Sequence, residues 1–310
     1  MTGAVTLGAY AVAAGLLGPA ALRRGWAVRA PRLAMVLWLA LPVSWVVAVA
    51  LAVLAAAAPL PLSWPGSRPG GRPALLAAHA MPGGAAVAAA GLVLAAVVGL
   101  RAGACVASGL ARGRRERREH AAFLTAAGRP DRALGAVILD EDAPAAYCLP
   151  CGRHRIVVST GALTALGPAQ LAAVLAHEHA HLRGRHHVTL TVAAALSRAF
   201  PRVPLLAQAG AEVAVLAEMA ADDAAARRHD PGDLAAALVI LARNGARARA
   251  LTASGPAAVT RIQRLLAPLP RPGIPARAAR LAAAAAAIAL PVAIACIPLV
   301  IAACDVTSQP

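Results

Sequence analysis

The fold and the chemistry are decided by the stretch LAAVLAHEHAHL, residues 171–182. It contains the pattern H-E-x-x-H, in which His177 and His181 lie four positions apart with Glu178 between them. On a helix, residues four apart share a face, so both imidazoles can reach one ion. Glu178 lies about 100° further round the helix, close enough to polarise a water at that ion. The spacing predicts metal-assisted hydrolysis with two histidine ligands and a carboxylate base.

The flanking residues predict a single helix over 168–183. Gly167-Pro168 is typical of a helix start, because proline suits the first helical position, and Gly184 marks the end. An apolar face is formed by Leu171, Val174, Leu175 and Leu182. The alternative reading is a histidine-rich surface helix that binds no metal.

Composition predicts membrane spans around one modest soluble domain. The 310 residues are 59% hydrophobic and only 14% charged, which is too apolar for an ordinary soluble domain. The formal net charge of +16 could favour nucleic acid, but the arginines cluster beside apolar segments. There they fit anionic lipid head groups. No nucleic-acid motif is present, so we expect the lipid bilayer as a partner and no direct binding of nucleic acid.

We expect a mostly α integral membrane protein with a small α+β soluble domain. Residues 1–111 hold three transmembrane helices with their loops, and residues 112–280 form the soluble domain, the region with mixed polarity. A fourth helix follows, and residues 304–310 form a short tail. The four expected spans are about 4–22, 33–60, 84–100 and 281–303.

Alternating apolar residues predict the strands of the soluble domain, and 3.6-residue periods predict its helices. The expected strands are 137–139, 145–149 and 155–159. The expected helices besides 168–183 are 121–129, 188–195, about 210–228 and 232–243.

Arginine clusters predict the orientation. They flank the apolar spans at 23–32, at 112–118 and at 271–280. The positive-inside rule places these flanks, and the soluble domain, in the cytoplasm of a cell membrane. Both termini would then lie outside.

The soluble domain resembles the BlaR/MecR-type membrane metallopeptidases, the beta-lactam sensors of bacteria. The resemblance spans about 80 residues, and the HtpX-like heat-shock and prenyl-protein membrane proteases share its motifs more distantly. It rests on AAYCLP (145–150), RIVVSTG (155–161), residues 171–187 and EMAAD (218–222).

The resemblance implies a zincin-like fold and a Zn²⁺ site of the gluzincin type, H-E-x-x-H followed by E-x-x-A-D. His177, His181 and Glu218 would bind the metal, Glu178 would be the general base, and Asp222 would orient a ligand.

Glu212 is the competing third ligand. It lies roughly 120° from Glu218 on the same expected helix and has Leu216 four positions on, where Glu218 has Asp222. The spacing therefore favours Glu218.

The other polar residues carry weaker expectations. His179 points off the ligand face, so it would face solvent or support a ligand. His186 and His187 are expected at the surface or the helix end, with support of a metal ligand as the alternative, and Glu212 and Asp223 are expected in solvent. Cys148 and Cys151 form a lone CxxC without a second pair, which favours a strand-turn role over metal.

The implied function is a membrane zinc metalloendopeptidase that acts on a protein or peptide at the cytoplasmic face. By analogy, Ala145, Ala146 and Tyr147 would form an edge on which an extended substrate pairs, and the substrate would be a DNA-binding repressor. The alternatives are an HtpX- or prenyl-protease-type enzyme of membrane-protein quality control, and a non-catalytic membrane metal-binding protein. Because only 304–310 follow the last span, we expect a short form without the sensors' penicillin-binding domain.

Overall fold

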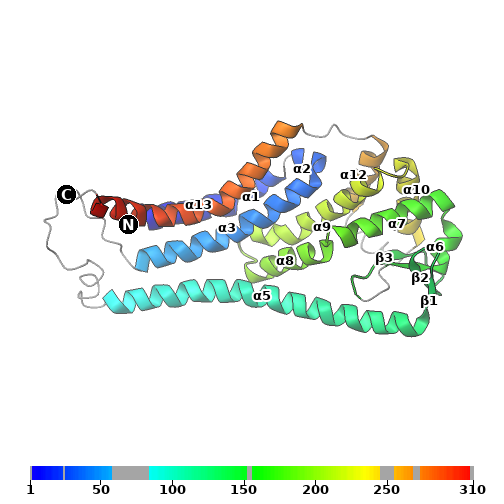
Figure 1. Ribbon diagram of the computed structural model, residues 1–310, viewed down its shortest axis with the longest axis horizontal. Helices are drawn as coiled ribbons and strands as arrows, with labels where there is room; N and C mark the ends of the chain where they lie inside the picture. The colour runs from blue at the N-terminus through cyan, green and yellow to red at the C-terminus, as the bar shows by residue number, and fades with distance from the viewer. Residues whose placement is uncertain are drawn as a thin grey trace.

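The computed structural model describes residues 2–23, 25–57, 84–151, 156–244, 255–267 and 273–307. Residues 58–60 of the second expected span, Arg155 and residues 308–310 of the expected tail lie outside these ranges. The described chain is mostly helical with one small sheet, as predicted. Figure 1 shows an elongated molecule, with the sheet at one end and the start of α1 and the end of α13 at the other.

The elements, in chain order, are α1 (Thr2–Leu22), α2 (Trp26–Arg29), α3 (Pro31–Ala57), α5 (Gly84–Ala127), β1 (Gly128–Asp131), β2 (Ala136–Leu139), β3 (Ala146–Cys148), β4 (Ile156–Ser159), α6 (Thr160–Ala165), α7 (Pro168–Arg183), α8 (His186–Ala199), α9 (Pro204–Ala225), α10 (Pro231–Asn244), α12 (Gly255–Leu266) and α13 (Ile274–Thr307).

Five of the described helices are long and apolar enough to cross a membrane: α1, α3, α5, α9 and α13. Four of them contain the expected spans. The fifth, α9, was expected in the soluble domain, and half of its most apolar window is buried inside the protein. The membrane character of the chain is therefore supported, whereas the count of four spans is not confirmed.

Helix α5 runs without a break through two segments that were expected to be separate helices. It has 44 residues, and no proline interrupts it. Its arginine-rich second half is helix-compatible, because Arg115 donates to Glu119 one turn later at 2.7 Å. The prediction of a separate helix at 121–129 was wrong. The single helix instead connects the apolar end of the molecule to the sheet (Figure 1).

The sheet has the strand order β1-β2-β4-β3 and includes the three expected strands. Strands β2 and β4 pair parallel at the centre of the sheet. At the two edges, β1 pairs antiparallel with β2, and β3 pairs antiparallel with β4. The sequence analysis missed β1, whose residues Gly-Arg-Pro-Asp lack apolar alternation; a proline is tolerated there because the strand is an edge. The turn after β1 is closed by Asp131, which accepts from two backbone N–H groups, and by Gly135 at a φ of +61°.

Two layers of helix connect the sheet to the apolar bundle. Helices α7 and α10 cover the sheet through a core that includes Val158, Val174 and Leu241. Helix α9 packs against α7 on one side and against α3 on the other, where its Leu205 joins a core with Trp38. Helix α9 therefore extends from the apolar bundle to α7, which carries H-E-x-x-H.

Candidate metal centre

Helix α7 has the bounds that the sequence predicts. Gly167 is its N-cap, Pro168 is its first residue, and Gln170 Oε1 accepts a hydrogen bond from the Gly167 N–H at 3.0 Å. Gly184 ends the helix, and Arg185 follows in the left-handed region at a φ of 48°. A Cβ atom at Gly184 would collide with the ring of His186, so glycine is required for the tight return of the chain into α8.

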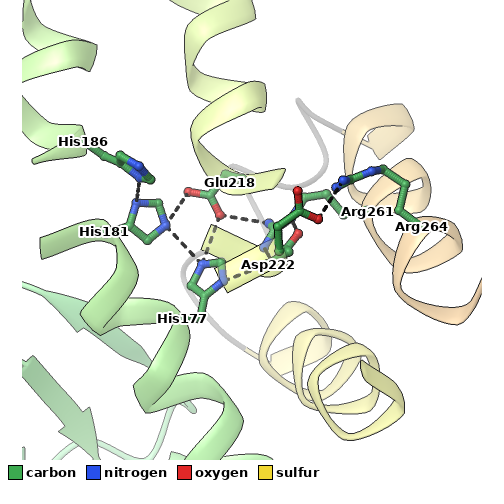
Figure 2. A network of polar contacts seen from close by, with 8 residues as sticks. His177, His181, His186, Glu218, Asp222, Arg261 and Arg264 are labelled. Atoms are coloured by element: carbon green, nitrogen blue, oxygen red, sulfur yellow. Dashed lines mark hydrogen bonds and ion pairs between the residues drawn. The ribbon is translucent and has the colours of Figure 1, made fainter. Parts of the chain in front are cut away.

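Alanines bring α9 close enough to α7 for their polar side chains to meet. Ala180 of α7 packs on Ala221 and Ala224 of α9, where larger side chains would hold the helices apart. One turn away, Glu218 comes to lie between the two motif histidines (Figure 2).

The three side chains offer donor atoms at separations close to those around a tetrahedral zinc ion. The Nε2 atoms of His177 and His181 are 3.1 Å apart. Glu218 Oε2 lies 3.6 Å from His177 Nε2, and Glu218 Oε1 lies 3.4 Å from His181 Nε2. Zinc bonded to nitrogen and oxygen at about 2.1 Å would separate its ligand atoms by about 3.4 Å. The donor set therefore suits Zn²⁺, with a fourth position left for water or substrate.

Asp222 orients His177 from behind. Its Oδ1 lies 3.0 Å from His177 Nδ1, which directs the other ring nitrogen of His177 toward Glu218 and His181. A carboxylate at this distance from the outer ring nitrogen is the usual partner that orients a metal-binding histidine. The carboxylate is only 1% exposed, so it needs a further partner.

That partner is Arg261, which the sequence analysis did not single out. Its Nε and Nη2 donate to the two Asp222 oxygens at 2.7 and 2.8 Å, and its Nη1 lies 2.9 Å from Glu218 Oε2. Burial disfavours its charge, but the hydrogen bonds to Asp222 and the charges of Glu218 and Glu178 raise the pKa of Arg261 above its usual value. Helix α12 is thereby anchored over the centre.

The same carboxylates act on His177. Burial lowers its pKa, but the close carboxylates of Asp222 and Glu218 outweigh burial and raise the pKa to about 9. Because a metal ligand must be neutral, zinc binding at His177 would release a proton near neutral pH. Glu178 is 2% exposed beside it on α7.

His186 supports the second histidine ligand. It lies at a helix end, as the first residue of α8, but not at the surface, since it is 5% exposed, and its Nδ1 lies 2.9 Å from His181 Nδ1. Burial, then the charge of His181, lower the pKa of His186 to about 4, so it is neutral at pH 7. One of the two Nδ1 atoms donates and the other accepts, and the contact holds the His181 ring as Asp222 holds that of His177 (Figure 2).

The remaining polar residues lie away from the three ligands. His179 is exposed, and Glu212 pairs with Arg23 at 2.7 Å. Asp223, which was expected in solvent, has a side chain 29% exposed, and its Oδ1 accepts from Arg264 at 2.8 Å. Cys151 packs in a cluster with Leu124, Leu149 and Val157.

The expected edge strand is in place. In the described sheet, β3 is an outer strand and packs against α7. It contains Ala146, which is buried, and Tyr147, whose hydroxyl lies 2.7 Å from His120 Nε2; Ala145 precedes it.

The Arg261–Asp222 contact predicts a loss of stability. Arg261→Met would leave a buried carboxylate short of a partner, so we expect metal-free protein to lose about 3–5 kcal/mol. Arg264→Met is the matched control on the same helix. Its partner Asp223 has a side chain 29% exposed, so we expect a loss of about 1 kcal/mol or less. Chemical unfolding of the two metal-free variants measures both. Equal losses would show that Arg261 has no special role.

Comparison with known proteins places the site in a peptidase context. The model of Peptidase family M48 matches residues 111–215, which include H-E-x-x-H but end before Glu218. A Protease HtpX homolog from Acidiphilium cryptum (strain JF-5) is 42% identical over 74 residues, which are 23% of this chain and 25% of that protein. The similarity therefore spans about a quarter of the relative's length. No solved structure matches.

With the apolar helices and the His177–His181–Glu218 group, these matches support a membrane metalloprotease. They do not confirm the BlaR/MecR type in particular.

Proposed function

We propose that this chain is a membrane zinc metalloendopeptidase in which His177, His181 and Glu218 hold the metal and Glu178 is the general base. The observation that carries the proposal is the convergence of three donor atoms from α7 and α9, all within 4.8 Å of one another. Glu178 adjoins these donors on α7. A closed structural zinc site has four protein ligands and needs no base, whereas a catalytic site has three and an open position.

The protein's own groups would act in sequence. Zinc, when bound, would supply polarisation of the scissile carbonyl and of water. Glu178 would accept the proton of the attacking water on its carboxylate and pass it to the departing amide nitrogen. Asp222 and His186 would keep both histidine rings aimed at the centre. An extended substrate would add to the outer edge of β3 at Ala145–Tyr147, with His179 facing solvent.

Two substrate classes remain in this proposal. An HtpX-type enzyme, which the match with an HtpX homolog favours, would process membrane proteins, and the BlaR/MecR resemblance implies cleavage of a DNA-binding repressor. Mapping of new protein N-termini in cells with wild-type or Glu178→Gln protein separates them. Termini that require Glu178 and lie in membrane proteins support the first class, and termini in a repressor support the second. Equal termini in both strains would contradict the protease.

Membrane sidedness is a further part of the proposal, and it rests on the arginine flanks. Both termini would lie outside and the metal centre in the cytoplasm. In a background without native cysteines, Ala133→Cys, an exposed position after β1, should resist a membrane-impermeant maleimide in intact cells and react after lysis. Thr2→Cys is the control and should react in both. Efficient labelling of Ala133→Cys in intact cells would reverse the orientation.

A further inference from the structure

A basic cavity lies next to the metal centre, where four helices meet. Its volume is about 610 Å³, within the size range of small-ligand sites. It is bounded by the beginning of α3, the ends of α7 and α9 and the beginning of α8. The residues that matter below are Arg32, Met35, Val36, Leu39, Arg183, His186, Arg227 and Arg228.

The charged residues that line this cavity are all positive. Four arginines line it, and no lining residue carries a carboxylate. Arg227 donates to the backbone carbonyl of Asp223 at 2.9 Å. In the described chain, no carboxylate forms an ion pair with Arg32, Arg183 or Arg228. Guanidinium groups that converge on one cavity repel one another, so an anion bound there would be stabilised by all of them.

Beyond Arg32, the part of the cavity wall that α3 contributes is apolar, and α3 is one of the helices long and apolar enough to cross a membrane. Met35, Val36 and Leu39 follow Arg32 on α3, and Val36 is 46% exposed. Arg32 stands just before the long apolar run of α3, so the cavity lies at the boundary where that helix would leave the bilayer. An anionic head beside an apolar chain matches both walls at once.

We propose that this cavity binds the phosphate head group of an anionic membrane phospholipid, with an acyl chain along α3. The four arginines of the cavity are exposed, as Arg114 and Arg118 are on one flank of α5, but they differ in where they come from. Here they come from α3, from α7 and from the residues after α9, and they surround one volume. A single side chain, that of His186, separates the cavity from the metal centre, because it lines the cavity and also contacts His181.

The test uses full-length protein reconstituted with equal phosphatidylglycerol and phosphatidylcholine, followed by native mass spectrometry of the lipid that stays bound. Wild-type protein should retain phosphatidylglycerol in preference. Arg183→Gln with Arg228→Gln should weaken that retention about tenfold or more, since each substitution removes a charged donor to phosphate. Arg114→Gln with Arg118→Gln removes the same charge outside the cavity and should behave as wild type.

Other outcomes overturn the proposal. Equal loss in both double variants would mean general surface attraction, and equal retention of both lipids by wild type would mean no head-group selectivity. Displacement of the lipid by millimolar inorganic phosphate would assign the site to free phosphate. If the cavity double variant does not fold, Arg228→Gln alone applies the same comparison with a smaller expected loss, and no loss there contradicts the site.

Discussion

Glu178→Gln should abolish proteolysis while leaving the metal in place. Glutamine matches the shape of glutamate but cannot accept a proton, and removal of a general base typically costs between about 100- and 10,000-fold in rate. Glu178 is not one of the three converging donors, so zinc content should stay at the wild-type value. The measurement is cleavage of an unfolded protein substrate by purified enzyme, with metal analysis of the same sample.

His179→Gln is the control for that experiment. It changes the next residue of α7, but His179 is exposed and should leave both rate and metal unchanged. Full activity in the Glu178→Gln protein would remove the base assignment. A wild-type protein that holds zinc but cleaves nothing, as its Glu178→Gln variant does, would favour the non-catalytic metal-binding alternative.

Glu218→Ala should lose most of the bound zinc. It removes one of three donors, and the two histidines that remain are too few for a stable site. Asp222→Asn keeps the shape but weakens the contact with His177 Nδ1, so a smaller loss is expected, on the order of 10- to 100-fold in affinity. Competition with a chromophoric chelator measures both.

Glu212→Gln is the matched control on the same helix. Its carboxylate pairs with Arg23, well away from the two histidines, and its removal should leave zinc affinity unchanged. The reverse order, with Glu212 needed and Glu218 dispensable, would show that the third ligand is misassigned.

Local patterns predicted much of this fold. Helix α7 has its expected bounds because its start and end are set locally, by Pro168 as its first residue and by Gly184 directly after its last. Strand β1 and the continuation of α5 were missed because the elements there were predicted from the pattern of apolar residues alone. The β1 residues are polar, and the α5 arginines end an apolar run without ending the helix.

The candidate site shows the same division. The spacing of His177, Glu178 and His181 can be recognised in the sequence as H-E-x-x-H. The spacing of Glu218 and Asp222 can be recognised in the same way as E-x-x-A-D. Arg261 is 39 residues from Asp222 in sequence, and no periodicity connects them. For His186 a supporting role was only the alternative, because its approach to His181 depends on the left-handed turn at Arg185, a conformation rare outside glycine. Long-range polar pairs of this kind follow from packing rather than from local pattern.

The most direct measurement is the rate of peptide hydrolysis by the purified full-length protein as a function of bound zinc. The metal is removed with a chelator and returned in steps, and the Glu178→Gln protein is carried through the same titration. We expect no cleavage without metal, cleavage that rises in proportion to bound zinc until each chain holds one ion, and none at any point with Glu178→Gln. Cleavage by metal-free protein, or equal rates for the two proteins, would contradict this expectation.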